Sequence, residues 1–70
     1  MKYAVVIERA KSNYSAYVPD LPGCIATGGT IQEAEFEIRN AIQLHLECLK
    51  QDGQRIPEPS SAVEYVEVAA

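Results

Sequence analysis

The sequence predicts a small α+β domain with elements in the order βββαβ, and three observations support this fold class. Three short segments rich in β-branched and aromatic residues lie near the N-terminus, with turn residues between them. One long amphipathic segment with a capping signature follows them. A last segment of alternating apolar residues closes the chain of 70 residues. We therefore expect one domain that spans residues 1–70.

The three expected strands cover residues 2–8, 14–18 and 24–27. The first has apolar residues on both faces, which favours a strand inside a sheet that is covered on both sides. The loop at residues 19–23 separates the second strand from the third. It contains two prolines, which fix φ, and a glycine that accepts a turn conformation. A pair of glycines at residues 28–29 is expected to end the third strand.

A capping box marks the start of the helix. The side chains of Thr30 and Glu33 are expected to accept hydrogen bonds from each other's backbone amides. The helix is predicted to run to about Asp52, and Gly53 fits the left-handed position that follows a helix end. Its apolar face is expected to contain Ile31, Ala34, Ile38, Ala41, Ile42, His45, Leu46, Cys48 and Leu49.

Residues 56–61 read as an extended linker, and residues 63–68 as the last strand. These elements predict a mixed four-stranded sheet in the order 3-2-1-4, because a right-handed crossover places the last strand beside the first. One helix covers only one face of such a sheet. A chain of this size is also marginally stable alone. We therefore expect a homodimer or larger homo-oligomer, formed through the helix-free face.

Composition and charge limit the function classes. The content of 47% apolar and 23% charged residues is typical of a folded domain, and no run is long enough to span a membrane. No signal peptide is evident, so we expect a cytoplasmic protein in which Cys24 and Cys48 are reduced thiols. The net charge of −4 disfavours direct binding to nucleic acids and favours a basic protein partner.

The sequence offers little for catalysis. His45 and Cys48 lie three residues apart on the helix, and such a pair can act as base and nucleophile. Both belong to the apolar face, however, and no third group follows from the spacing to orient them. The carboxylates of a two-metal nuclease should project from the middle of the first strand, whereas this chain has only Glu8 at the end of that strand. We expect no enzyme activity, cofactor or metal; a residual metal-dependent nuclease is the alternative.

The loop at residues 19–23 is the strongest candidate site. We expect it to be rigid and exposed, with Leu21 between a carboxylate and prolines, as is typical of a protein-binding tip with little entropy to lose. Two further apolar residues, Phe36 and Leu44, fall outside the apolar face of the helix. Both fit ordinary exposed apolar residues, but a Phe in this position on so small a domain also suggests a second buried contact. The predicted partner-binding residues are Tyr17, Asp20, Leu21, Pro22 and Gly23.

The chain resembles the HicB family of antitoxins. The resemblance rests on residues 17–24, with the sequence YVPDLPGC, on Gly29-Thr30 before a helix that contains Glu33-Ala34, and on the stretch from Asp52-Gly53 to Ile56-Pro57-Glu58-Pro59-Ser60. It covers nearly the whole chain. It implies a truncated RNase H-like fold without the carboxylates of the nuclease. It also implies a partner, HicA, a small basic toxin that cleaves messenger RNA and that the antitoxin silences by covering its catalytic surface.

Many HicB-family members continue into a helix-turn-helix or ribbon-helix-helix segment that binds the operator. Residues 1–70 contain no such segment, so we expect no C-terminal DNA-binding domain and no binding to DNA by this chain alone. The resemblance thus predicts a non-catalytic antitoxin that binds a HicA-like toxin. A solitary structural or regulatory domain without a toxin is the alternative from another functional class.

Overall fold

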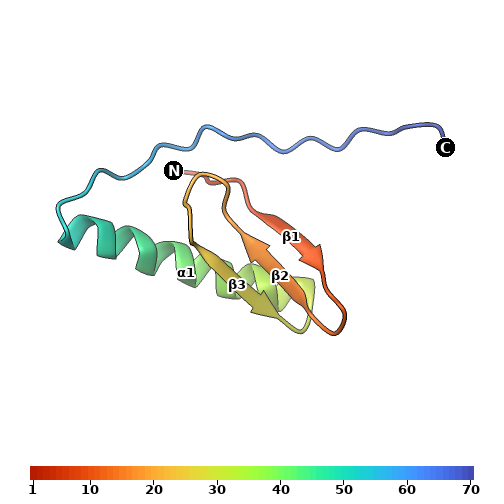
Figure 1. Ribbon diagram of the computed structural model, residues 1–70, viewed down its shortest axis with the longest axis horizontal. Helices are drawn as coiled ribbons and strands as arrows, with labels where there is room; N and C mark the ends of the chain where they lie inside the picture. The colour runs from red at the N-terminus through yellow and green to blue at the C-terminus, as the bar shows by residue number, and fades with distance from the viewer.

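The computed structural model describes residues 1–70 and contains three strands and one helix. The sheet is antiparallel in the order β1-β2-β3. The helix α1 packs on one face of this sheet, mainly against β3 and β2 (Figure 1). The predicted α+β class and the order of the first four elements are confirmed. Their bounds are β1 Val6–Arg9, β2 Tyr14–Tyr17, β3 Ile25–Gly28 and α1 Ile31–Gln51.

The fourth strand predicted for residues 63–68 does not form within this chain, so the sheet has three strands and not four in the order 3-2-1-4. After α1 the chain returns past the N-terminal residues, where the Tyr3 hydroxyl donates a hydrogen bond to the Pro57 carbonyl. It then continues in extended form away from the sheet (Figure 1). This path diverges from β1, so residues 62–70 reach no backbone partner and stay exposed.

The first strand is shorter than predicted, because its partner strand ends early. The register pairs Val6 with Tyr17, so the residues before Val6 would have to pair with Val18 and Pro19. Proline has no N–H to donate, and the chain turns away at this point. Residues 2–5 therefore lie outside the ladder.

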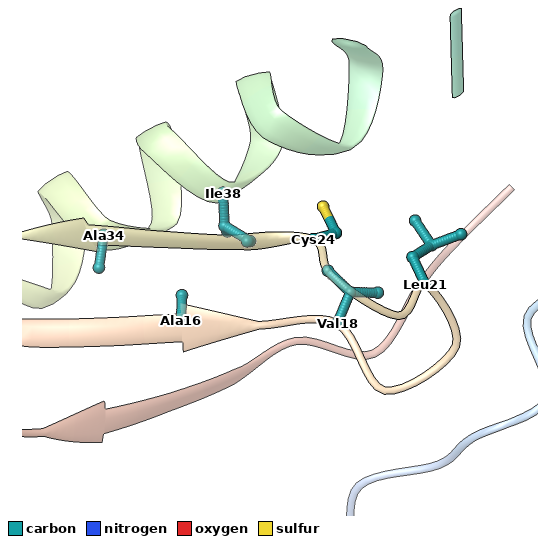
Figure 2. Packing of buried hydrophobic residues seen from close by; sticks show 6 residues of the cluster. All are labelled: Ala16, Val18, Leu21, Cys24, Ala34 and Ile38. Atoms are coloured by element: carbon teal, nitrogen blue, oxygen red, sulfur yellow. The ribbon is translucent and has the colours of Figure 1, made fainter. Parts of the chain in front are cut away.

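The core lies between α1 and one face of the sheet. Figure 2 shows Ala16 of β2 facing Ala34 of α1, while Val18, Leu21 and Cys24 gather at the loop end of the sheet. The largest fully buried side chains are those of Leu21 and Ile38. The expectation of a sheet covered on both faces is wrong for a single chain, because α1 covers one face only. The fully buried residues are Ala16, Val18, Leu21, Cys24, Ala34 and Ile38.

Side-chain hydrogen bonds fix the start of α1. The Thr30 hydroxyl accepts a hydrogen bond from the Glu33 amide at 3.0 Å, as predicted. The Glu33 carboxylate, however, accepts from the amide of Gly29 at 2.9 Å and not from that of Thr30. The reciprocal half of the capping box is therefore shifted by one residue, and it ties the turn after β3 to the helix.

The end of α1 is as predicted. Gly53 has φ +69°, and the amide of Gln54 donates to the Leu49 carbonyl at 2.9 Å, which is the pattern of a Schellman motif. Most of the predicted apolar face packs on the sheet, but Ile31 and Cys48 at its margins are exposed.

Candidate partner-binding surface

The loop between β2 and β3 consists of two consecutive turns. The Leu21 amide donates to the Val18 carbonyl at 3.1 Å, and the Cys24 amide donates to the Leu21 carbonyl at 3.0 Å. In the second turn Pro22 fixes φ, and Gly23 has φ +83°, the combination that a type II turn requires. The loop is therefore as rigid as its prolines and glycine predicted.

Leu21 is fully buried, so the expectation that it is exposed at the tip of this loop is wrong. It is the last residue of the first turn and the first residue of the second, and both turns bind its backbone. Figure 2 shows its side chain close to Val18 and Cys24 at the loop end of the core. Pro22 and Gly23 remain exposed. Leu21 thus shapes the loop, while its neighbours form the accessible tip.

Asp20 binds the end of the linker. One carboxylate oxygen accepts the backbone amides of Ser60 and Ser61, both at 3.0 Å. The other accepts their hydroxyls, at 3.1 and 2.8 Å. The amide of Ser61, then the amide of Ser60 and the Ser61 hydroxyl, lower the pKa of Asp20 to about 2. Sequence reasoning missed this contact, because no spacing rule connects residues that lie 40 positions apart.

We expect the contact between Asp20 and the serines to be lost only in strong acid. Because the folded-state pKa is lowered, the contact is complete above the ordinary pKa of 3.8 and disappears as the pH falls through about 2. The amide NMR signals of Ser60 and Ser61 should therefore titrate with a midpoint near 2. In Asp20→Ala this titration should be absent. A midpoint at the ordinary value would contradict the contact.

Tyr17 lies on the face of the sheet that α1 leaves uncovered. The registers place it between Val6 of β1 and Ile25 of β3, so the three side chains form one row across that face. Tyr17 is 38% exposed and Ile25 is 71% exposed. The structure therefore separates the predicted site residues. Tyr17 lies on the uncovered face, Leu21 lies in the core, and Asp20 is bound to the end of the linker.

Two hollows lie on the side of the molecule where the loop and β3 border α1. One shallow hollow, of about 230 Å³, is lined by residues that include Gly23, Ile25 and Leu44. A second one, of about 450 Å³, lies between the end of β3 and Phe36. Phe36 and Leu44 are both 63% exposed, so the second buried contact that the sequence suggested for Phe36 is not made within the chain. We call this the loop–helix surface; it comprises Pro22, Gly23, Ile25, Phe36 and Leu44, with Glu33, Glu37 and Glu47 around them.

Three groups with possible reactivity, His45, Cys48 and Cys24, line the first hollow together. His45 is half-buried and Cys48 is exposed at the edge of the first hollow. Cys24 is a free buried thiol, and burial raises its pKa above the ordinary value. No group of three His, Cys, Asp or Glu side chains is arranged to hold a metal ion. α1 is not both long enough and apolar enough to cross a membrane.

The fold and this surface define a small α+β domain with one helix across three antiparallel strands and an exposed apolar and acidic side. Residues 3–69 match the model of the family described as HicB_like antitoxin of bacterial toxin-antitoxin system. The chain belongs to this HicB-like antitoxin family, as its resemblance predicted.

The chain is also similar to two curated proteins and to one chain of a solved complex. A UPF0150 protein of Thermoplasma acidophilum is 39% identical over 62 residues, which cover 87% of this chain and 90% of the relative. An uncharacterized 14.9 kDa protein of Haemophilus phage HP1 is 33% identical over 66 residues, or 94% of this chain, which thus spans half of that relative's length. A chain of the HicA3 and HicB3 toxin-antitoxin complex superposes with a TM-score of 0.74 at 27% identity, over 86% of this chain and 70% of the other.

Proposed function

We propose that this protein is a non-catalytic antitoxin that binds a small basic ribonuclease toxin of the HicA kind and silences it by direct contact. The observation that carries the proposal is the loop–helix surface, where exposed apolar side chains lie at two hollows whose lining includes Glu33 and Glu37 and no lysine or arginine. Such a surface fits a basic partner, because opposite charges steer the encounter while apolar contacts hold the complex. The match to a chain from a toxin-antitoxin complex supports the same partner class.

The predicted partner-binding residues enter this proposal with different roles. Tyr17, Pro22 and Gly23 are exposed, and we assign them to direct contact with the toxin. Leu21 contributes by holding the loop in place, and Asp20 contributes by ordering the linker beside it. We also propose that the scaffold is a truncated RNase H-like fold that self-associates, acts in the cytoplasm and does not itself bind DNA.

The first experiment is a toxin-neutralisation assay. RNA cleavage by a purified HicA-type toxin, encoded beside this gene, is measured with increasing amounts of this protein. We expect cleavage to stop near stoichiometric amounts. A toxin that cleaves at full rate in the presence of excess protein would refute the antitoxin function and favour a solitary structural or regulatory domain.

Charge reversal on the loop–helix surface tests the binding site. Glu37→Lys/Glu47→Lys is expected to slow association with the toxin roughly tenfold or more at low salt, because it replaces attraction by repulsion at the contact. Glu8→Lys/Glu58→Lys changes the net charge equally at positions outside this surface and is the matched control. Association rates measured by surface plasmon resonance at two salt concentrations separate the cases. Equal rates for both variants would place the toxin elsewhere.

A further inference from the structure

The helix leaves a groove open beside β1. Because α1 packs mainly on β3 and β2, it barely reaches the first strand. The space between α1 and the residues that lead into β1 has a volume of about 410 Å³. Its apolar lining consists of Met1, Tyr3, Val5, Ile38 and Ile42. A fourth strand beside β1 would cover this groove, and the chain does not place one there.

The segment that the sequence predicts as a strand lies unused. Residues 62–68 are extended and exposed, with Tyr65 95% exposed and Val66 79% exposed. Their backbone amides and carbonyls have no ladder partner, and the outer edge of β1 is equally unpaired. The chain therefore has a free segment with strand character and a free sheet edge beside an open apolar groove. Such a segment can pair with such an edge and cover the groove.

We propose that two copies of this chain exchange these segments, so that residues 62–68 of one copy pair with the outer edge of β1 of the other and cover its groove. This inference rests on the self-association proposed above and names its structural basis. The exchange is reciprocal, so a two-fold axis closes it into a dimer. Each copy then has the four-stranded sheet that the sequence pattern predicts.

Length and charge both fit this exchange. Residues 62–68 span about 23 Å at about 3.3 Å per residue, as do residues 3–9, which comprise β1 and the chain before it. The charged residues that border the groove are Lys2, Arg39 and Glu35, whereas the segment carries Glu64 and Glu67. Glu35 pairs with Arg39 at 3.6 Å on the exposed side of α1, which leaves Lys2 as the cation of this border that has no ion-pair partner in the chain.

The contact at Asp20 favours a second copy over the chain's own β1. Four hydrogen bonds from Ser60 and Ser61 hold the start of the segment beside the loop at residues 19–23. From this point the segment runs away from the body of the molecule, and the C-terminus is its most distant end in Figure 1. A segment that is held at its base and projects outward reaches a neighbouring molecule without rearrangement of the fold.

Proline substitution tests the strand pairing. In a strand, the N–H groups of two adjacent residues point toward opposite edges. Tyr65→Pro/Val66→Pro therefore removes a ladder hydrogen bond whichever edge of the segment pairs with β1. We expect sedimentation equilibrium to give a dimer for the unchanged chain and a dimer Kd at least tenfold weaker for this variant. Ala69→Pro/Ala70→Pro, just beyond the segment, is the control and should remain dimeric. A monomeric unchanged chain, or a proline variant with unchanged Kd, would overturn the exchange.

A spin-label experiment identifies the strand that accepts the segment. Chains with Cys48→Ser and a nitroxide on Ala69→Cys are mixed with unlabelled ¹⁵N chains, so that any line broadening arises between chains. We expect broadening to be strongest in β1 and to decrease through β2 to β3. Broadening that is strongest in β3, or absent, would overturn the proposal. The neutralisation assay is read separately, because a proline variant that keeps the dimer Kd of the unchanged chain contradicts only this inference, and an unchanged chain that is dimeric but does not neutralise the toxin contradicts only the antitoxin function.

Discussion

Leu21→Ala is expected to leave a large fraction of the chain unfolded at 25 °C. The Leu21 side chain is fully buried and is one of the two largest in the core. Truncation of a buried leucine costs about 2–5 kcal/mol, since it removes buried apolar contacts and leaves a cavity. A single core of this size supplies about 3–5 kcal/mol of stability. The substitution therefore consumes most of the free energy of unfolding.

Urea denaturation followed by circular dichroism measures this loss. Leu44→Ala makes the same chemical change at a side chain that is 63% exposed, and its effect on the free energy of unfolding should stay within about 0.5 kcal/mol. Similar losses for the two variants would show that Leu21 is not a core residue. The pair also separates folding from binding, because Leu44→Ala should weaken the toxin complex while the domain stays folded.

Leu21 also shows which features of the loop could be predicted from the sequence and which could not. Pro22 and Gly23 predicted a rigid turn, because their φ preferences act within one or two residues. The direction of the Leu21 side chain depends instead on how two turns follow each other and on α1, which lies further along the chain. Leu21 is an apolar residue between prolines, which was itself a signal of burial. The prediction of an exposed Leu21 followed instead from the assumption that the tips of loops point toward solvent.

The same distinction between local and distant causes explains the other outcomes. The ends of α1 were predictable because Thr30 and Gly53 act on amides and carbonyls within a few residues. Residues 63–68 have the β-propensity of a strand, but propensity does not determine which strand they pair with. The net charge favoured a basic partner, and Phe36 and Leu44 were recognised as lying off the apolar face. Only the fold shows that Leu44 lies beside Gly23 of the loop at residues 19–23.

Gly28→Ala is expected to destabilise the domain by about 3 kcal/mol or more. A Cβ at this position would lie 2.4 Å from the backbone nitrogen of Ala34 and 2.8 Å from the carbonyl carbon of Glu33. These are atoms of the first turn of α1, and a backbone cannot move aside as a flexible side chain can. Overpacking of a core typically costs 1–3 kcal/mol when side chains can adjust, so a clash with backbone lies at or above the top of that range.

Gly29→Ala is the control, because its Cβ would meet only the carboxylate end of the Glu33 side chain, at 3.1 Å. We expect Gly29→Ala to lower the free energy of unfolding by less than about 1 kcal/mol in the same urea titration. Equal losses for both glycines would contradict the close approach of Gly28 to α1.

The role of Gly28 differs from the one that the sequence suggested. It was expected to end the third strand, and it instead belongs to β3. Its missing side chain lets the first turn of α1 lie directly on β3. That contact places Phe36 beside the end of the strand, so the same glycine that permits the packing also positions one end of the loop–helix surface.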